Sequence, residues 1–130
     1  MFSILEICDR AGMEAQTLRN WIASGLVQPD KRDGLGRGGA HQFSTMKSVG
    51  LIVAQNVRAS EQSCLPVYFG KVVEAFAAVD EKWLLKEFKQ GRVYFVLAHH
   101  GRPILSDDAF GRPNVKAAFE QTRICPAKGN

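Results

Sequence analysis

The first apolar pattern in the chain predicts a short helix close to the N-terminus. Its apolar residues follow helical spacing and would line one face, namely Ile4, Ile7, Cys8 and Ala11. Ser3 and Glu6 have the S-x-x-E spacing of a capping box, in which each side chain hydrogen-bonds a backbone N–H group at the helix start. Because Cys8 lies on the apolar face, we interpret it as a small core residue rather than a reactive thiol.

A second helix follows within the segment 12–26, which reads GMEAQTLRNWIASGL. Its apolar stripe would consist of Leu18, Trp21 and Ile22. Its opposite face would carry polar side chains, namely Gln16, Thr17, Arg19 and Asn20. Gly25 predicts a Schellman-type helix end, and the short connection 12–14 has the length expected in a helix-turn-helix.

The segment 27–42, VQPDKRDGLGRGGAHQ, predicts a glycine-rich hairpin, and we call it the wing. We expect Val27 to pair with Gln42 and Phe43 in two short strands. The wing offers hydrogen-bond donors for phosphate oxygens at Lys31, Arg32, Arg37 and His41, while Asp30 and Asp33 reduce its positive charge. A linker without contacts is the alternative. A nucleotide-binding loop is disfavoured because the G-K-[ST] ending is missing.

A third helix is predicted from Ser44, its capping residue, to about Arg58. Its apolar positions are Met46, Val49, Val53 and Val57. The polar run that follows predicts a domain boundary near 59–65. We therefore expect two domains, residues 1–60 and residues 61–130.

Beyond this boundary the pattern predicts two short helices. The first begins at Pro66, and its apolar stripe is Phe69, Val72, Val73 and Phe76. The second is capped by Asp80, ends at Gly91, and carries Trp83, Leu84 and Phe88. The interruption at 77–80 argues against a long coiled coil.

The remaining residues predict a hairpin and a final helix. The run 93–98 has the β-branched and aromatic content of a strand, and 103–105 would return antiparallel to it. A helix over 114–122 would point Val115, Ala118 and Phe119 inward. The expected fold class is mainly α with a small β component: an N-terminal winged helix-turn-helix followed by a small helix–hairpin–helix C-terminal module.

Residues 2 to about 60 resemble the winged helix-turn-helix of the MerR superfamily. The family pattern G-V-S-x-x-T-L-R-Y-Y-E-x-x-G-L is matched here at Gly12, Thr17, Leu18, Arg19, Gly25 and Leu26, and Trp21 stands at an aromatic position. The chain departs from the pattern at Glu14, Asn20 and Ile22. The tract TLRNWIASGL also resembles phage excisionases and terminase small subunits.

The resemblance implies that the helix over residues 15–24 enters the major groove of DNA and that the wing contacts phosphates. Carried over by position, the contacts to bases or flanking phosphates would come from Gln16, Thr17, Arg19 and Asn20. These residue types suit the task, since Gln and Asn can pair with adenine and Arg with guanine or phosphate. A polar face that contacts only solvent is the alternative interpretation.

Net charge adds little to this picture. The 130 residues carry a formal charge of +4. Residues 1–60 hold seven Lys/Arg against five Asp/Glu, and residues 61–130 hold ten against eight, so that each half contributes +2. The positive charge is therefore not concentrated on the half that resembles a DNA-binding domain.

Several other classes of protein are disfavoured. No apolar run is long enough to span a bilayer and no signal peptide is evident, so we expect a cytoplasmic protein without a membrane partner. Three widely spaced cysteines predict neither a disulfide framework nor a zinc site. No catalytic motif occurs, so we expect no enzyme.

Potential metal ligands form no compact motif. They are His99, His100, Asp107, Asp108, Cys64 and Cys125. We interpret the histidines as part of a hairpin turn and the aspartate pair as a helix cap. We expect no metal and no cofactor.

The sequence thus predicts a sequence-specific double-stranded DNA-binding transcriptional regulator. It would act as a homodimer, with RNA polymerase or another regulator as a further partner. One alternative is an architectural DNA-binding factor of the excisionase or terminase type. Another is a protein-interaction adaptor that has kept the fold and lost DNA binding.

Overall fold

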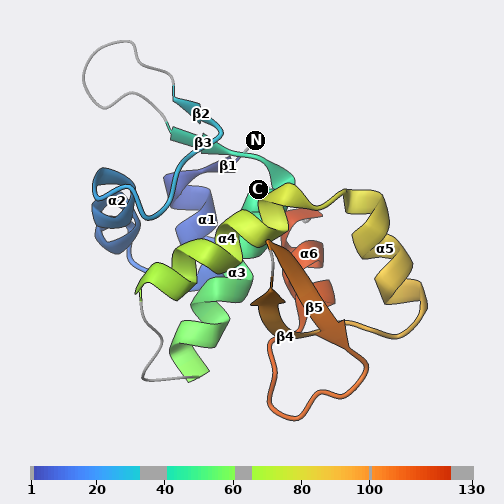
Figure 1. The fold of residues 1–130 in the computed structure, drawn as a ribbon. Helices are drawn as coiled ribbons and strands as arrows, with labels where there is room; N and C mark the ends of the chain where they lie inside the picture. The colour runs from blue at the N-terminus through green and yellow to red at the C-terminus, as the bar shows by residue number, and fades with distance from the viewer. Residues whose placement is uncertain (1, 33–40, 61–65, 100, 124–130) are drawn as a thin grey trace.

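The computed structural model describes residues 2–32, 41–60, 66–99 and 101–123 (Figure 1). Within them the chain forms helices joined by short loops, together with two small antiparallel sheets. The elements in order are β1 (Phe2–Ser3), α1 (Ile4–Ala11), α2 (Ala15–Ala23), β2 (Lys31–Arg32), β3 (His41–Phe43), α3 (Thr45–Ser60), α4 (Pro66–Ala78), α5 (Glu81–Lys89), β4 (Tyr94–His99), β5 (Arg102–Ser106) and α6 (Val115–Arg123). The expectation of a mainly helical fold with a small β component is confirmed.

The start of α1 has the predicted capping box. The Ser3 backbone N–H donates to Glu6 Oε1 at 2.9 Å, and the Glu6 N–H donates to Ser3 Oγ at 3.2 Å. The four predicted core residues of α1 are all buried, Cys8 among them. Gly12 ends the helix with a left-handed φ of 70°, which a residue with a side chain adopts at a cost. The short connection to α2 is therefore built as the sequence predicts.

The end of α2 is a Schellman motif, also as predicted. Gly25 has a φ of 84° and donates its N–H to the Ile22 carbonyl at 3.1 Å, while the Leu26 N–H donates to the Trp21 carbonyl at 3.0 Å. Leu18 and Ile22 are buried, and Trp21 is partly exposed. These bonds satisfy carbonyl groups at the helix end and turn the chain towards the hairpin.

The strand pairing around the hairpin differs from the prediction. Strand β3 lies between β1 and β2, with Phe2 opposite Phe43 and Lys31 opposite Gln42. The prediction that Val27 forms a strand is wrong, because the Schellman turn delivers the Val27 side chain into the core, where it is fully buried. Strand β1 was not predicted, since two residues are too few to show an alternating pattern.

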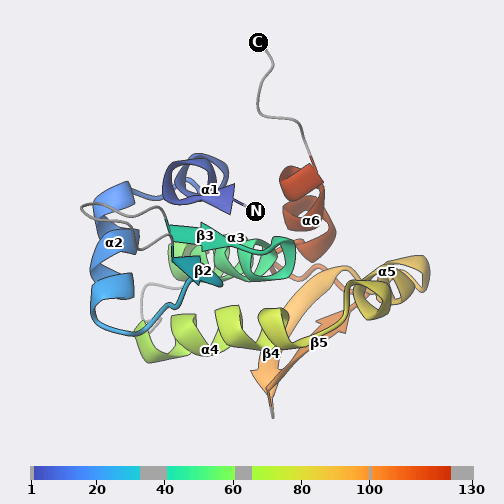
Figure 2. The same ribbon diagram turned by 90° about the horizontal axis from the view of Figure 1, so that it is seen from above.

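Helix α3 lies at the centre of the molecule. Figure 2 shows α4 on one side of it and α1 and α6 on the other. Ser44 caps it as predicted, accepting the Lys47 N–H at 3.2 Å, and the helix continues to Ser60, slightly beyond the predicted end. Its buried surface is wider than the predicted single stripe and also includes Leu51, Ile52 and Ala54. A helix packed on several sides is apolar over most of its circumference, which explains the difference.

The C-terminal half follows the predicted elements closely. The four residues of the apolar stripe predicted for α4 are all buried. Asp80 caps α5 by accepting the Lys82 N–H at 3.1 Å. Strands β4 and β5 are antiparallel, with His99 opposite Arg102. Two predictions are wrong: His99 lies in β4 rather than in the turn, and Asp107 and Asp108 do not cap α6. Asn114 does so, because its Oδ1 accepts the Ala117 N–H at 2.9 Å.

A single hydrophobic core connects both halves of the chain. Phe43 and Val49 from the N-terminal half belong to the same buried cluster as Phe76 and Val115 from the C-terminal half. The division at 59–65 into two domains stays a prediction. None of the helices in the described part of the chain has the length and apolar character that crossing a bilayer requires.

Candidate nucleic-acid interface

The outward face of α2 presents the polar side chains that the sequence singled out. Gln16, Arg19 and Asn20 are exposed and Thr17 is half-buried, while Leu18 and Ile22 on the opposite face are buried. Gln16 Nε2 donates to Asn20 Oδ1 at 2.9 Å, which holds the two amides side by side. After this bond each amide keeps N–H donors, and Gln16 keeps its oxygen as an acceptor, so both can still pair with another molecule.

Arg19 contributes an accessible positive charge to this face. Burial raises the pKa of the Cys8 thiol, and the nearby guanidinium of Arg19 acts in the opposite direction without outweighing it. Arg19 is therefore close enough to α1 for its charge to act on the Cys8 thiol. Within the residues that the structure describes, no carboxylate forms a salt bridge with Arg19.

A second arginine lies beside α2, and no sequence motif identifies it. The guanidinium carbon of Arg58, near the end of α3, is 5.0 Å from the centre of the Trp21 ring. Trp21 also packs edge-on against Phe69 of α4, with ring centres 4.1 Å apart. The Trp21 ring thus joins α2 to α4 and positions an exposed arginine next to the helix. Residues so distant in sequence are brought together only by the tertiary fold.

The hairpin lies at the same end of the molecule as α2, away from α5 (Figures 1 and 2). Lys31 and Arg32 form β2, and His41 begins β3 opposite Arg32. Arg37 and Asp33 lie outside the described residues. Of the four residues of the wing that we expect to contact phosphates, Lys31, Arg32 and His41 thus lie on the paired strands β2 and β3.

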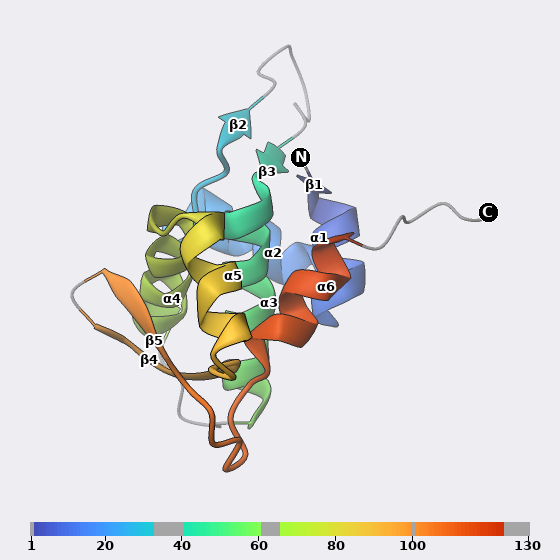
Figure 3. The same cartoon turned by 90° about the vertical axis from the view of Figure 1, so that its right-hand side faces the viewer.

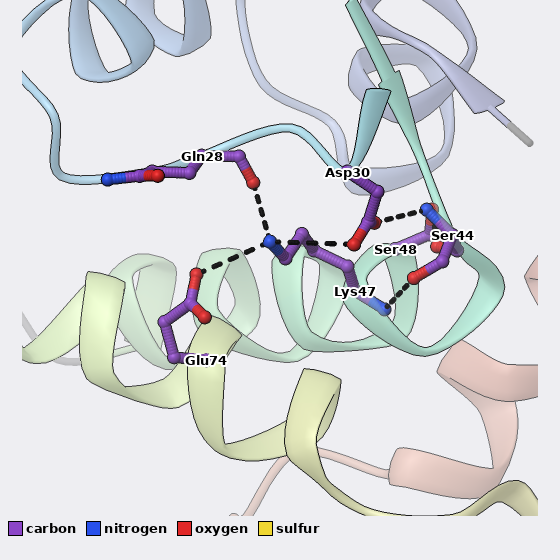
Figure 4. Close-up of polar contacts among 6 residues, drawn as sticks. All are labelled: Gln28, Asp30, Ser44, Lys47, Ser48 and Glu74. Atoms are coloured by element: carbon purple, nitrogen blue, oxygen red, sulfur yellow. Dashed lines mark hydrogen bonds and ion pairs between the residues drawn. The ribbon is translucent and has the colours of Figure 1, made fainter. Parts of the chain in front are cut away.

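Lys47 fixes the base of this hairpin to the core (Figure 4). Its side chain is only 8% exposed, and its Nζ donates to the Gln28 carbonyl at 2.7 Å. The same Nζ lies 3.7 Å from Asp30 Oδ1 and 3.5 Å from Glu74 Oε2 on α4. One buried ammonium group therefore ties together the segment after α2, the start of α3 and the middle of α4.

Asp30 has a structural role that the sequence interpretation missed. Its Oδ2 accepts the Ser44 N–H at 2.6 Å, and its N–H donates to the Gln42 carbonyl at 2.9 Å. The ion pair with Lys47 balances the negative charge of Asp30, whose side chain remains 30% exposed. No local motif identifies the pair, since a buried lysine is uncommon and has no characteristic spacing.

The described residues contain no group of three or more His, Cys, Asp or Glu side chains that could hold a metal ion. The arrangement at α2 and the hairpin offers hydrogen-bond donors, amides and positive charge, the groups that contact nucleic-acid bases and phosphates. No protein-family model, curated protein or solved structure matches the chain. The polar face of α2 and the hairpin beside it are therefore the features of the molecule that indicate a function.

Proposed function

We propose that this protein binds double-stranded DNA by placing α2 in the major groove. The observation that carries the proposal is the division of α2 into two faces, with Gln16, Arg19 and Asn20 exposed opposite the buried Leu18 and Ile22. An α-helix fits the major groove, where Arg can pair with guanine and Gln or Asn with adenine. Thr17, half-buried on the same helix, would contact a flanking phosphate or a base edge.

The rigid mounting of α2 supports this role. The helix is stopped by the Schellman motif, held to α4 by the Trp21–Phe69 ring contact, and followed by a segment that Lys47 fixes to the core. A recognition helix reads base edges only if its side chains are held in a defined position. The three contacts supply this positioning at the C-terminal end of α2.

The hairpin and Arg58 would supply the phosphate contacts. In the proposal, Lys31, Arg32, Arg37 and His41 contact the backbone from the wing, and Arg58 contacts it beside the C-terminal half of α2. Contacts of this kind fix the register of a protein on the duplex and carry no sequence information. They make binding weaken as the salt concentration rises.

The biological output that fits best is regulation of transcription by a cytoplasmic homodimer, with RNA polymerase or another regulator as a further partner. A dimer would place two copies of α2 on two half-sites and so extend the sequence that is read. Architectural DNA binding of the excisionase or terminase type would use the same surface. A protein-interaction adaptor is the second candidate, favoured by the equal division of positive charge between the two halves.

Selection of bound duplexes from a random pool tests the proposal. At about 50 mM salt, where electrostatic contacts are strongest, we expect enrichment of one motif, and a two-fold symmetric motif for a homodimer. Enrichment without a motif would favour the architectural function. Retention of no duplex at this salt concentration would contradict DNA binding and leave the adaptor.

A further inference from the structure

The turn between β5 and α6 exposes an aromatic side chain in a strained conformation. Phe110 is 83% exposed, the highest value among the large apolar residues of the described chain. Its φ is 35°, the only positive φ at a described residue other than glycine, and Gly111 follows with a φ of 72°. Two successive residues of positive φ are usually Asn-Gly, because asparagine tolerates this region and a bulky side chain does not. The turn therefore holds a phenylalanine where neither solvent exposure nor backbone geometry favours one.

Acidic side chains precede this aromatic residue. Asp107 and Asp108 are both exposed, and the following Ala109 is exposed as well. Arg112, behind the turn, has its guanidinium carbon 5.7 Å from the centre of the Phe110 ring and donates to the Asp108 carbonyl at 3.0 Å. We call residues 107–111 the acidic turn. It would fit a surface on which an apolar side chain is surrounded by positive charge.

Helix α5 presents such a surface. At helical spacing its outward face consists of Lys82, Leu85, Lys86 and Lys89, all exposed, with Leu85 at 39%. We call these four residues the α5 face. In the part of the chain that the structure describes, none of the three lysines is within salt-bridge distance of a carboxylate.

The carboxylates of α5 are engaged away from this face. Glu81 pairs with Arg123 of α6 at 3.7 Å, and Glu87 pairs with Arg92 at 2.8 Å. The hydrogen bond from Arg92 holds the pKa of Glu87 below its usual value, in agreement with this pairing. The α5 face is therefore basic and apolar, while the acidic groups of the same helix are bound within the protein.

We propose that a second copy of this chain docks through these two surfaces, with the acidic turn of each copy lying on the α5 face of the other. In a two-fold symmetric pair each copy contributes both surfaces, so the contact is made twice. Phe110 packs against Leu85 of the partner copy. Asp107 and Asp108 lie among the three lysines of the partner copy's α5 face. The proposal rests on the dimer named in the proposed function and does not depend on DNA binding itself.

The charge and apolar content of the two surfaces favour a second copy over other partners. DNA would be repelled by Asp107 and Asp108 beside Phe110. An anionic membrane surface would repel the same aspartates, and the two surfaces together offer it only Phe110 and Leu85, too little apolar area for stable anchoring. Opposite charges around an apolar centre give the complementary pattern of a protein interface.

The position of the two surfaces is compatible with the proposed function. Figures 1 and 2 place α5 at the end of the molecule away from α2, and Figures 1 and 3 show the turn after β5 at the end opposite β2 and β3. Association through these two surfaces leaves α2 and the hairpin accessible. Both copies can therefore present their polar α2 faces while the dimer is formed.

Sedimentation velocity of the full chain without DNA tests the apolar contact. We expect a concentration-dependent dimer that Phe110→Ser weakens at least about tenfold in Kd, the effect of removing a central interface residue. Leu5→Ser is the matched control, since Leu5 is 65% exposed on α1 and lies outside both surfaces. A monomeric wild-type chain, or equal dimerisation of Phe110→Ser and wild type, would overturn the proposal.

A mixing experiment tests the charge pairing. One variant reverses the acidic turn (Asp107→Lys with Asp108→Lys) and the other reverses the α5 face (Lys82→Glu with Lys86→Glu). Each variant alone repels its own copies and should be monomeric, whereas an equal mixture restores attraction at both contacts and should form heterodimers. Thermal unfolding verifies that both variants are folded. If both are unfolded, the dimerisation of Phe110→Ser alone decides whether the proposed interface is correct.

The results separate this proposal from DNA binding. A mixture of folded variants that stays monomeric would exclude the assigned pairing, even if the wild-type chain dimerises. Selection of a DNA motif by a monomeric chain would overturn the dimer and leave the assignment of α2 in place. Loss of DNA binding with an intact dimer would overturn the assignment of α2 and leave the dimer in place.

Discussion

The buried side chain of Lys47 holds the base of the hairpin in position. Its ammonium group is buried and surrounded by a carbonyl and two carboxylates. Burial of a charge is unfavourable unless its partners replace the hydrogen bonds of water. The side chain therefore stabilises the fold only as long as Gln28, Asp30 and Glu74 keep their positions.

Replacement of this side chain should be costly. Lys47→Met keeps the apolar stem and removes the charge, leaving the Gln28 carbonyl without its donor and the Asp30 and Glu74 carboxylates without their ion-pair partner. We expect the free energy of unfolding to fall by about 2 kcal/mol, as for loss of a hydrogen bond to a charged group. Urea denaturation followed by circular dichroism measures the change.

Lys71→Met on α4 is the control for Lys47→Met. Lys71 is exposed, and its replacement should change the free energy of unfolding by less than about 0.5 kcal/mol. Equal effects of the two substitutions would show that the network around Lys47 does not hold the hairpin base.

Residues with a local signal were predictable, and residues whose role depends on the fold were not. Ser3, Glu6 and Gly25 act within one helix end, so their spacing alone identified the capping box and the Schellman motif. Lys47 and Asp30 act across the fold. Composition alone therefore predicts that Asp30 reduces the positive charge of the wing, whereas its carboxylate is paired with Lys47.

At the scale of elements, the contact between α4 and the segment after α2 determines how α2 is held. A Cβ atom on Gly70 would lie 2.6 Å from the Leu26 carbonyl oxygen, closer than such atoms approach. Glycine at this position therefore allows α4 to approach the end of α2 closely. The Trp21–Phe69 ring contact lies at the same junction.

Gly70→Ala tests this close approach. Alanine normally stabilises a helix relative to glycine, but here we expect a loss of about 1–3 kcal/mol because the methyl group overpacks the junction. Thermal unfolding measures the change, and Lys71→Ala on the same helix is the exposed control. A stabilised Gly70→Ala variant would mean that α4 does not press on the segment after α2.

The helices were predictable because each carries an apolar stripe of several residues, as Leu18 and Ile22 do in α2. Elements of two or three residues have no such periodicity. Strand β1 was therefore missed, and Val27 was placed in a strand although its side chain belongs to the core. The pairing of β4 with β5 shifts in register between Phe95 and Leu97. The amino-acid sequence of β4 alone does not show this irregularity.

At the scale of the whole molecule, one hydrophobic core includes residues from both halves of the chain. The polar run near 59–65 predicts a domain boundary, because polar residues along the sequence are typical of a linker. The packing of α4 against α3 and α2 depends on long-range contacts that composition does not contain. Separate unfolding of two halves would expose part of this shared core to water.

We expect both halves to unfold together. The chain has two tryptophans, Trp21 on α2 and Trp83 on α5. Trp83→Phe leaves fluorescence that reports on α2, and Trp21→Phe leaves fluorescence that reports on α5. In each variant the fluorescence midpoint in urea should coincide with the circular dichroism midpoint, as a two-state transition requires. An α5 signal that persists after α2 has unfolded would instead support two domains.

Fluorescence anisotropy of Arg19→Ala tests the proposal that the exposed face of α2 reads DNA sequence. Binding is compared on the selected duplex and on a scrambled duplex, beside Lys31→Ala and the charge-matched control Lys116→Ala on α6. We expect Arg19→Ala to lose about 1–3 kcal/mol of binding free energy on the selected duplex and much less on the scrambled one. Lys31→Ala should weaken both duplexes alike, and Lys116→Ala should weaken neither. An equal loss on both duplexes for Arg19→Ala would contradict the proposal.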